Sequence, residues 1–340
     1  MKAVRAEPDG SVLLVELDPP RIGPGEALIR VRASGICGSD LLPWYVAGKA
    51  GTVLGHELSG EILALGDGVT EFAPGDRVVP HHHAPCLECA ACRAGRYVHC
   101  PSWRSSRLDP GGMAELVRIP AINLRHDTRM VPPRLTDEEA AFTEPLATVL
   151  KAFVRGGFES GQSVLVIGLG TAGQLAVRLA RGRDAGQVAG ADRVDSRLEL
   201  AGRSGADETI DVRSEPLAAG ARRISGGAGF DFVLVCPGGA EVAEQAVEAA
   251  SPGGTVLLFT MTPPGEMLAL PAHDLYFREI RIIPSYSCGP DDTRTALEVI
   301  AAGIVPVDDL VTHRFPIAEA AEAFARAADP RDSVKVMITG

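Results

Sequence analysis

The sequence of 340 residues contains no apolar run of the ~18–20 residues that a membrane-spanning helix needs. Its first twenty residues carry charges throughout, so they do not resemble a signal peptide. No basic block is present and the formal net charge is −11, which argues against nucleic acid or an anionic membrane as a partner. Lysine is scarce, since only four of the 33 basic residues are lysines, and we assign no function to that bias. We therefore expect a soluble, cytoplasmic protein.

The cysteines do not resemble the disulfide framework of a secreted protein. Their number is odd, four of the seven lie between positions 86 and 100, and no signal peptide precedes them. Clustered thiols in a cytosolic chain indicate metal binding instead. The seven are Cys37, Cys86, Cys89, Cys92, Cys100, Cys236 and Cys288.

The length allows two domains, and 46% hydrophobic with 23% charged residues is a globular composition. The first third has short β-branched runs separated by glycine and proline turns, which predicts a mostly antiparallel β-domain. A capping-box pattern at 136–139 precedes an alanine-rich stretch and predicts a helix start. From Ser163 onward strand and helix patterns alternate, which predicts an α/β fold with a doubly wound parallel sheet. Two amphipathic helices, 291–302 and 317–327, and a strand, 334–338, are expected to follow.

The segment 164–173 reads VLVIGLGTAG, a complete G-x-G-x-x-G motif between a predicted strand and a predicted helix. Gly168 would form the tight turn, Gly170 would admit a pyrophosphate, and Gly173 would let the helix pack closely. Free N–H groups at the helix N-terminus attract the phosphates. A second predicted strand ends in Asp192, where a carboxylate would hold a ribose 2′-hydroxyl. The pattern predicts a dinucleotide site.

The choice of cofactor depends on the residues around the end of that second strand. Asp192 favours NAD, because its charge repels the 2′-phosphate of NADP. Arg193 and Arg197 leave NADP as the less favoured alternative, since arginine can bind that phosphate, although surface charge is the simpler explanation for them. The expected cofactor-binding residues are Gly168, Gly170, Thr171, Ala172, Gly173, Asp192, Arg193 and Arg197.

Two metal sites of different character are predicted. The cysteines at 86, 89, 92 and 100 have the spacing of a four-thiolate zinc site, whose closed shell holds a loop together and performs no catalysis. A dispersed set comprises Cys37, His56, Glu57 and Glu144. One cysteine, one histidine and one or two carboxylates match a catalytic zinc that keeps a position for water. Spacing alone does not show that these four residues converge.

The stretch 55–69, with Gly55-His56-Glu57 followed by Gly60, Gly66 and Val69, resembles the signature of zinc-containing alcohol dehydrogenases in the medium-chain dehydrogenase/reductase superfamily. The segment FAPGDRV at 72–78, the four cysteines and the nucleotide motif follow in that family's order. The resemblance covers essentially the whole chain. It implies a mostly β GroES-like catalytic domain (1–148 and 287–340, with the zinc lobe at 86–100) split around a Rossmann NAD-binding domain (149–286). It also implies a homodimer or homotetramer.

The resemblance further implies two zinc ions per chain, with Cys37 and His56 on the catalytic ion and the four clustered cysteines on the structural one. Glu144 stands where ethanol-type members have a cysteine, which resembles the sorbitol and threonine dehydrogenase branches. In those branches Glu57 or Glu144 completes the shell, directly or through a water. Ser39 matches the hydroxyl that takes the substrate proton. Zinc would polarise the substrate hydroxyl while a hydride passes to the nicotinamide.

The chain departs from that family at positions near the expected site. Many relatives have a histidine shortly after the CGSD motif that passes the proton to solvent. This chain has Leu-Leu-Pro at 41–43 instead. The candidates for the proton path beyond Ser39 are therefore water and a ribose hydroxyl. Sorbitol dehydrogenases carry Arg-Tyr where this chain has Ser285-Tyr286, which puts sorbitol itself in doubt. Trp44 and Tyr286 are the expected substrate-pocket residues. In the run HHH at 81–83, we expect one solvent-facing and one packed histidine.

These observations predict an NAD-dependent, zinc-dependent dehydrogenase of a small secondary alcohol, namely a polyol, sugar alcohol or cyclitol. The alternative within the class is an L-threonine dehydrogenase or a broad secondary-alcohol dehydrogenase. The alternative from another class is a non-catalytic, zinc-stapled dinucleotide-binding protein. Such a protein would not need Cys37, Ser39, His56 and both glutamates together.

Overall fold

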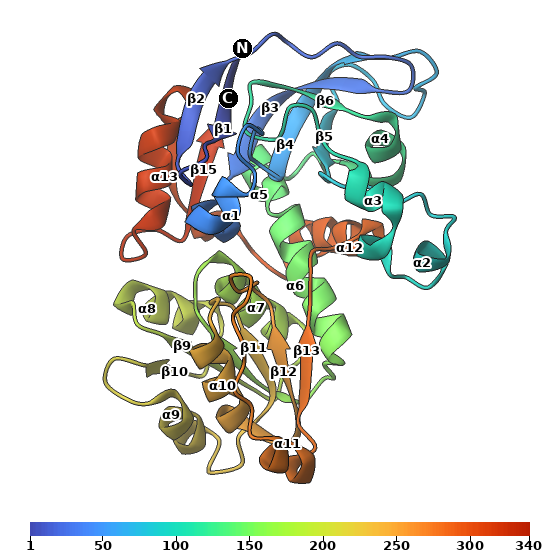
Figure 1. Cartoon of the computed structure of the whole chain (residues 1–340). Coiled ribbons are helices and arrows are strands. Elements are labelled where there is room, and N and C mark those ends of the chain that lie inside the picture. The colour runs from blue at the N-terminus through green and yellow to red at the C-terminus, as the bar shows by residue number, and fades with distance from the viewer. The chain divides into compact units, whose positions relative to one another are not determined.

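A computed structural model describes all 340 residues and divides the chain into two compact units (Figure 1). Unit 1 comprises residues 1–147 and 288–340, and unit 2 comprises residues 148–287. The chain passes from one unit to the other at 147/148 and at 287/288, and each point lies one residue from the boundary expected from the sequence. No helix combines the length and apolar character that a bilayer span requires.

Unit 1 is built on a seven-stranded sheet in the order β14-β15-β3-β4-β5-β7, with β6 also paired to β3. All its strand pairs are antiparallel except β14 with β15. Strands β1 and β2 form a separate antiparallel pair. The strands are β1 (Lys2–Ala6), β2 (Val12–Glu16), β3 (Ala27–Gly35), β4 (Glu57–Leu65), β5 (Arg77–Pro80), β6 (Leu116–Ile119), β7 (Thr128–Met130), β14 (Val311–Pro316) and β15 (Lys335–Thr339).

The helices of unit 1 are short and connect or flank these strands. They are α1 (Pro43–Ala47), α2 (Ala90–Arg93), α3 (Pro101–Ser105), α4 (Ala121–Asp127), α5 (Asp137–Ala141), α12 (Pro290–Ala301) and α13 (Ala320–Ala328), with 3₁₀ turns η1 (Gly38–Leu41), η2 (Tyr97–His99), η3 (Asp308–Leu310) and η4 (Ile317–Glu319). The expected capping box starts α5, because the Thr136 hydroxyl accepts from the Glu139 N–H at 3.1 Å and the Glu139 carboxylate accepts from the Thr136 N–H at 2.7 Å.

Alternating side chains of β3 and β4 form the centre of the unit 1 core. Ile29, Val31, Leu58 and Ile62 are all buried there. The helix α6 (Thr143–Gly156) begins in unit 1 with Thr143 and Glu144 and ends in unit 2. This sheet therefore positions the ends of β3, β4 and β5, where the predicted ligands lie.

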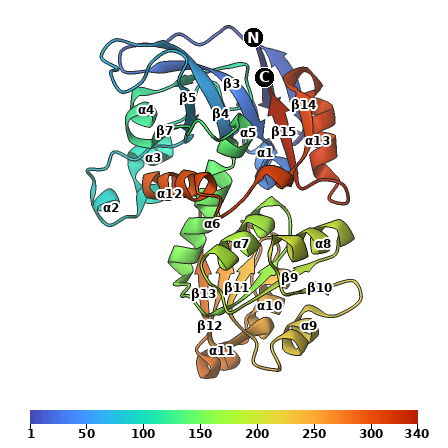
Figure 2. The same cartoon turned by 180° about the vertical axis from the view of Figure 1, so that it is seen from behind.

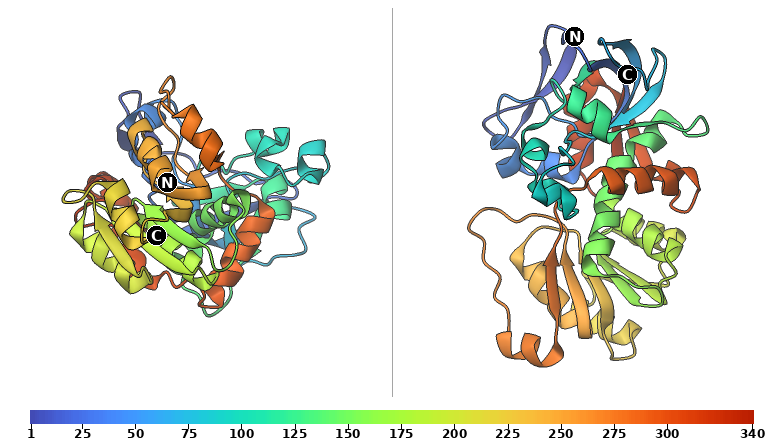
Figure 3. Two further views of the ribbon diagram at one scale, coloured as in Figure 1. Left: turned by 90° about the horizontal axis from the view of Figure 1, so that it is seen from below. Right: turned by 90° about the vertical axis from the view of Figure 1, so that its right-hand side faces the viewer.

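Unit 2 is a parallel six-stranded sheet in the order β10-β9-β8-β11-β12-β13, and the chain order reverses between β8 and β11. Helices α7 and α8 pack together, as do α9 and α10, and Figures 2 and 3 show helices on both faces of the sheet. The elements are β8 (Ser163–Ile167), α7 (Thr171–Gly182), β9 (Gln187–Asp192), α8 (Asp195–Ser204), β10 (Glu208–Asp211), α9 (Leu217–Ile224), β11 (Phe230–Val235), α10 (Ala240–Ala249), β12 (Ala250–Leu258), α11 (Ala272–Arg278) and β13 (Arg281–Pro284). The doubly wound α/β fold is confirmed.

Candidate metal centres and dinucleotide site

The four clustered cysteines converge on one point in the loop between β5 and α4. Their sulfurs lie 3.5 Å apart for Cys89 and Cys92, 3.6 Å for Cys86 and Cys100, and 3.9 Å for Cys86 and Cys92. A tetrahedron of sulfurs at the Zn–S distance of ~2.3 Å has edges of about 3.8 Å, so the set fits a zinc ion. Trp103 packs against the buried Cys92 and Cys100 and gives the loop a small core of its own.

The dispersed set is brought together by the pairing of β3 with β4. Cys37 follows β3, His56 precedes β4, and Glu57 is the first residue of β4, opposite Gly35. The ligand atoms of Cys37, His56 and Glu57 all lie within 4.8 Å of one another. Thiolate, imidazole and carboxylate form a three-residue donor set that fits a catalytic zinc and leaves further positions on the ion.

A buried carboxylate supports two of these ligands. Asp40, in η1, accepts a hydrogen bond from the Cys37 N–H at 3.2 Å, and its other oxygen lies 4.0 Å from Nδ1 of His56. Burial alone would lower the pKa of His56, but the charges of Asp40, Cys37 and Glu144 raise it well above its usual range. The N–H of Ser39 donates to the Cys37 sulfur at 3.5 Å. Asp40 and Ser39 therefore hold the cysteine end of the site.

Glu57 is held by Lys335 of β15, which sequence reasoning missed. The two side chains form an ion pair, and both are almost completely buried. Nζ of Lys335 also donates to the Ile36 carbonyl at 3.1 Å. The sequence does contain one indication of this pair, which is the single lysine in the apolar strand Lys335–Thr339. A lysine that is buried in such a strand needs an acidic partner.

Glu144 lies in a second group rather than with Cys37. Its carboxylate oxygen and the ring nitrogens of His81 and His82 lie within 4.8 Å of one another. Glu144 is only 7% exposed, and burial raises the pKa of its carboxyl, although the charges of His56 and His81 act in the opposite direction. The rings of His56 and His82 are 5.2 Å apart between centroids, so the two groups are neighbours.

The three histidines at 81–83 differ from the expectation. His81 is buried, His82 and His83 are half-buried, and none faces solvent fully. The run lies beyond the end of β5, so the alternation of a strand no longer applies to it. Burial and the neighbouring histidines lower the pKa of His82 well below its usual range, and burial lowers that of His83 to about 4.

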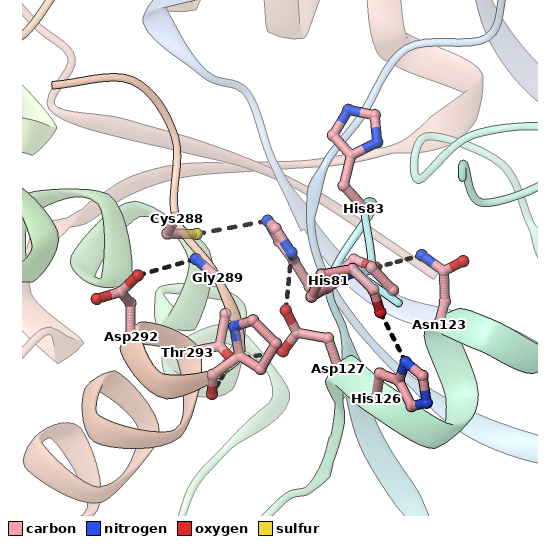
Figure 4. Close-up of polar contacts among 12 residues, drawn as sticks. His81, His83, Asn123, His126, Asp127, Cys288, Gly289, Asp292 and Thr293 are labelled. Carbon is pink, nitrogen blue, oxygen red and sulfur yellow. Dashed lines mark hydrogen bonds and ion pairs between the residues drawn. The ribbon is translucent and has the colours of Figure 1, made fainter. Parts of the chain in front are cut away.

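His81 is the centre of a buried polar network (Figure 4). Its Nδ1 lies 3.0 Å from Oδ2 of Asp127, and its Nε2 lies 3.4 Å from the sulfur of Cys288. Thr293, in α12, donates its hydroxyl to Oδ1 of Asp127 at 2.5 Å, and Asn123 donates to the His81 carbonyl at 3.0 Å. Cys288 has no role among the metal sites predicted from the sequence. It is buried, but it also contacts an imidazole.

The predicted pocket residues belong to different units. Trp44 lies in α1 of unit 1, is half-buried, and packs edge-on against Tyr45. Tyr286 lies in unit 2 with a mostly exposed side chain, and its carbonyl accepts from Nζ of Lys151 at 2.6 Å.

The glycine motif in unit 2 has the geometry of a dinucleotide site. Gly168 has a φ of +82°, and a Cβ there would lie 2.6 Å from Pro237. A Cβ on Gly173 would overlap the carbonyl oxygen of Gly168, whereas a Cβ on Gly170 would meet nothing nearer than 3.7 Å, at Arg197. Gly170 precedes the first turn of α7, where Thr171 and Ala172 lie. The motif therefore leaves the open approach that a pyrophosphate needs.

Asp192 ends β9 and is tied to the glycine loop. Its carboxylate accepts from the N–H groups of Leu169 at 2.7 Å, Arg193 at 2.7 Å and Val194 at 3.0 Å. The Arg193 side chain is exposed. The Arg197 carbonyl accepts from Gln174 at 3.0 Å, and burial lowers the pKa of the Arg197 guanidinium against the opposing charge of Asp192. The carboxylate is thus fixed at the loop expected to receive the cofactor.

Segments in both units of this chain are similar to known protein families. The alcohol dehydrogenase GroES-like domain matches residues 23–126, and the zinc-binding dehydrogenase domain matches residues 172–302. L-threonine 3-dehydrogenase of Pyrococcus horikoshii is 32% identical over 92% of this chain and 90% of its own. Sorbitol dehydrogenase of Bacillus subtilis is 30% identical over 99% of this chain and 97% of its own. A zinc-binding dehydrogenase of Sinorhizobium meliloti, solved with NADP, is 30% identical with a TM-score of 0.87, covering 100% of this chain and 99% of its own.

Proposed function

The chain belongs to the zinc-binding alcohol dehydrogenase family, and from that premise we propose that it oxidises a secondary hydroxyl of a polyol, sugar alcohol or cyclitol with NAD. The observation that carries the proposal is the convergence of Cys37, His56 and Glu57 within 4.8 Å. An isolated dinucleotide-binding protein would have no reason to bury these donors together with the Glu57–Lys335 ion pair.

We assign the catalytic ion to Cys37, His56 and Glu57. Glu57 is favoured over Glu144 as the third ligand, because Glu144 groups with His81 and His82. When bound, zinc acts as a Lewis acid toward the substrate hydroxyl and NAD accepts the hydride. Asp40 accepts a hydrogen bond from the Cys37 N–H and places its charge 4.0 Å from His56, and Lys335 fixes the carboxylate of Glu57. The chain's own residues thus pre-organise the donor set.

Ser39 is the residue to which we assign the substrate proton. It lies two residues beyond Cys37 in η1, and its N–H donates to the Cys37 sulfur at 3.5 Å. This bond fixes the backbone of Ser39 beside the sulfur of Cys37. Leu41 and Leu42 follow where a histidine would continue the path, so we assign the next transfer to water or to a ribose hydroxyl of the cofactor.

The four-cysteine site has a different role. Its donor set is all thiolate, its sulfurs are already near tetrahedral spacing, and it leaves no position for substrate. We propose that a second zinc ion there stabilises the loop 86–105 and takes no part in hydride transfer.

The cofactor assignment to NAD rests on Asp192. Its carboxylate is buried and bonded to the glycine loop, so a 2′-phosphate would meet a fixed negative charge. The similar Sinorhizobium protein was solved with NADP, so family membership alone does not decide between NAD and NADP. The preference of this chain therefore needs a direct test. Asp192→Ala should lower kcat/KM for NAD and raise it for NADP, while an unchanged preference would contradict the assignment.

We also propose a homo-oligomer formed through unit 2. Strand β13 pairs only with β12 and leaves one edge open, and Tyr276 and Phe277 of the adjacent α11 are 76% and 71% exposed. An open strand edge with exposed aromatic residues favours a second copy as the partner. Light scattering coupled to size exclusion measures the mass, and Phe277→Asp should shift it toward the monomer.

The substrate class is tested by following NADH absorbance with a panel of polyols, cyclitols, L-threonine and simple secondary alcohols. We expect the highest kcat/KM among polyols, because Glu144 replaces the cysteine of ethanol-type members. Highest activity with simple alcohols would overturn the polyol assignment. L-threonine is the second candidate, and the Pyrococcus relative is the observation that favours it.

A further inference from the structure

His83 lies between the two cysteine-containing metal groups of unit 1, and no step of the proposed function uses it. Its ring centroid lies 4.2 Å from the ring of Trp103 in the four-cysteine loop (86–105) and 4.3 Å from the ring of His82. The ring of His82 lies 5.2 Å from that of His56, a ligand of the proposed catalytic ion. We propose that His83 is a positioning residue that couples the placement of His56 to the four-cysteine loop. This inference rests on the proposed function, because it takes His56 as a ligand.

His83 is anchored at the neck of this loop, where residues 84 and 106 meet. Its Nδ1 lies 2.6 Å from the Ser106 carbonyl oxygen, and since a carbonyl only accepts, Nδ1 carries the proton. The Ser106 hydroxyl accepts from the Ala84 N–H at 2.8 Å and closes the neck. Burial lowers the pKa of His83 to about 4, so its ring stays neutral and keeps this hydrogen bond near neutral pH.

The partner of His83 inside the loop depends on the cysteines. Trp103 is buried and packs with Cys92 and Cys100 in the small core of the loop. The planes of the His83 and Trp103 rings are inclined by 39° to each other. Since cysteines make up most of that core, it should loosen when the thiolates lose their shared ion. The contact between Trp103 and His83 therefore depends on an intact four-cysteine site.

His82 takes its orientation from the rings around it. Its Nδ1 is buried and has no hydrogen-bond partner. Its ring packs against those of His81, at 4.6 Å between centroids, His83 and His56. Aromatic rings attract one another at such separations in tilted and edge-on arrangements. His81 is itself held by Asp127, which lies 3.0 Å from its Nδ1, so removal of the His83 ring would free His82 only on the side of the loop.

The contacts of His56 make its position sensitive to His82. The side chain of His56 is mostly buried, and Asp40, at 4.0 Å from its Nδ1, is too far away for a hydrogen bond. The packing of the ring therefore contributes to its orientation as a donor. Replacing a residue that orients a metal-bound histidine typically costs ~10–100-fold in metal affinity or activity. We expect the lower end of that range for His83, because it acts through His82.

His126 offers a matched control for His83. Its Nδ1 lies 2.7 Å from the carbonyl oxygen of Pro85, so it makes the same kind of hydrogen bond to the same stretch of chain. No aromatic ring packs against it, and in Figure 4 the rings of His83 and His126 point in different directions. His126→Ala therefore removes a histidine–carbonyl bond beside the four-cysteine loop and leaves the series of rings untouched.

The test is the affinity of each zinc ion, measured by competition with a chromogenic chelator, together with the zinc count per chain. Wild type should hold two ions, and Cys37→Ser, which keeps only the four-cysteine ion, gives the reference affinity for that site. His83→Ala should weaken the catalytic ion by ~10-fold, while the four-cysteine ion and the trypsin resistance of the loop stay as in wild type. His83→Phe, which keeps the ring, should recover most of the affinity, and His126→Ala should match wild type.

A double-mutant cycle tests the coupling to the loop. Trp103→Leu keeps the four thiolates but removes the ring, so combined with His83→Ala it should weaken the catalytic ion no more than either change alone. If Trp103→Leu exposes the loop to trypsin, the comparison of His83→Ala with His83→Phe and His126→Ala decides alone. Additive losses, an unchanged affinity in His83→Ala, or an equal loss in His126→Ala would overturn the inference and leave the dehydrogenase assignment standing. A single ion in wild type would overturn the proposed catalytic centre, and this inference with it.

Discussion

The two cysteine-containing metal groups of unit 1 are assembled in opposite ways. The four-cysteine loop takes all its donors from residues 86–100, and its sulfurs are 3.5–3.9 Å apart. The Cys37–His56–Glu57 group takes its donors from the segment after β3 and from the start of β4, and Asp40 and the sequence-distant Lys335 lie beside them. On the proposed assignment, the first is a local site that would fold with its metal, and the second is a site whose donors are held by buried charges.

The difference in assembly matches the two proposed roles, namely stability for the four-cysteine loop and catalysis for the Cys37–His56–Glu57 group. A local all-thiolate site has few contacts apart from its metal, so metal binding and folding of the loop are one event. A site built on a sheet keeps its shape without the ion, which lets the metal hold an open position for substrate.

The largest effect is expected from Cys100→Ser, which removes a buried thiolate from the loop. Structural zinc contributes as much as ~10 kcal/mol to the folding of small zinc modules, so the loop 86–105 should unfold. Limited trypsin digestion should then cleave after Arg93, which is exposed in a loop that the intact site protects. Cys236→Ser, in unit 2, is the control, and equal protease resistance in both variants would contradict the local role.

Cys37→Ser should abolish turnover while the chain stays folded. Loss of the Lewis acid should lower kcat/KM by ~10³–10⁴-fold, or about 4–5 kcal/mol. NADH absorbance reports the activity, and trypsin resistance of the loop 86–105 should match wild type. Activity within a few-fold of wild type would remove Cys37 from the catalytic set.

Lys335→Met should destabilise unit 1 by ~3–5 kcal/mol, because it leaves the buried carboxylate of Glu57 without its cation. Denaturant unfolding followed by circular dichroism measures the loss. Glu57→Gln combined with Lys335→Met should recover part of the stability but not the activity. Full stability of Lys335→Met alone would show that the Glu57–Lys335 ion pair does not stabilise unit 1.

The smallest effect is expected in unit 2, where Asp231 ties three strands together without metal. Its carboxylate accepts from the Ser163 N–H at 2.9 Å, the Ser163 hydroxyl at 2.8 Å and the Ser251 hydroxyl at 3.0 Å. Asp231→Asn should lower the free energy of unfolding by ~1–3 kcal/mol, measured by denaturant unfolding. Adding a metal chelator should not change that difference.

The same residue gives a pH dependence. Burial would raise the pKa of Asp231, but the hydrogen bonds from Ser163 and Ser251 outweigh it and lower the pKa below its unfolded value. Its contribution to stability is therefore complete above the unfolded pKa of about 3.9 and is lost as the pH falls through the folded value. Unfolding midpoints measured from pH ~6 to ~3 should converge for wild type and Asp231→Asn, whereas a constant gap would contradict this account.

Local sequence patterns predicted those features that depend only on residues close together in the chain. The capping box of Thr136 and Glu139, the turn of Gly168 and the four-cysteine loop depend on spacing that the chain itself displays. The short helix α9 is rich in glycine and alanine, which no local pattern distinguishes from a loop, and its packing against α10 decides the outcome. The edge strand β13 was missed, since only four residues carry it.

The sequence alone determined the family, the two-domain α/β architecture and the set of residues able to bind zinc and a dinucleotide, because glycine turns and clustered thiols act over short distances. Only the tertiary structure decided which donors meet. It paired Lys335 with Glu57, brought Asp127 and Cys288 to His81, and grouped Glu144 with His81 and His82 rather than with Cys37. Those contacts join residues up to 278 positions apart, and their geometry follows from strand pairing and burial that no local pattern encodes.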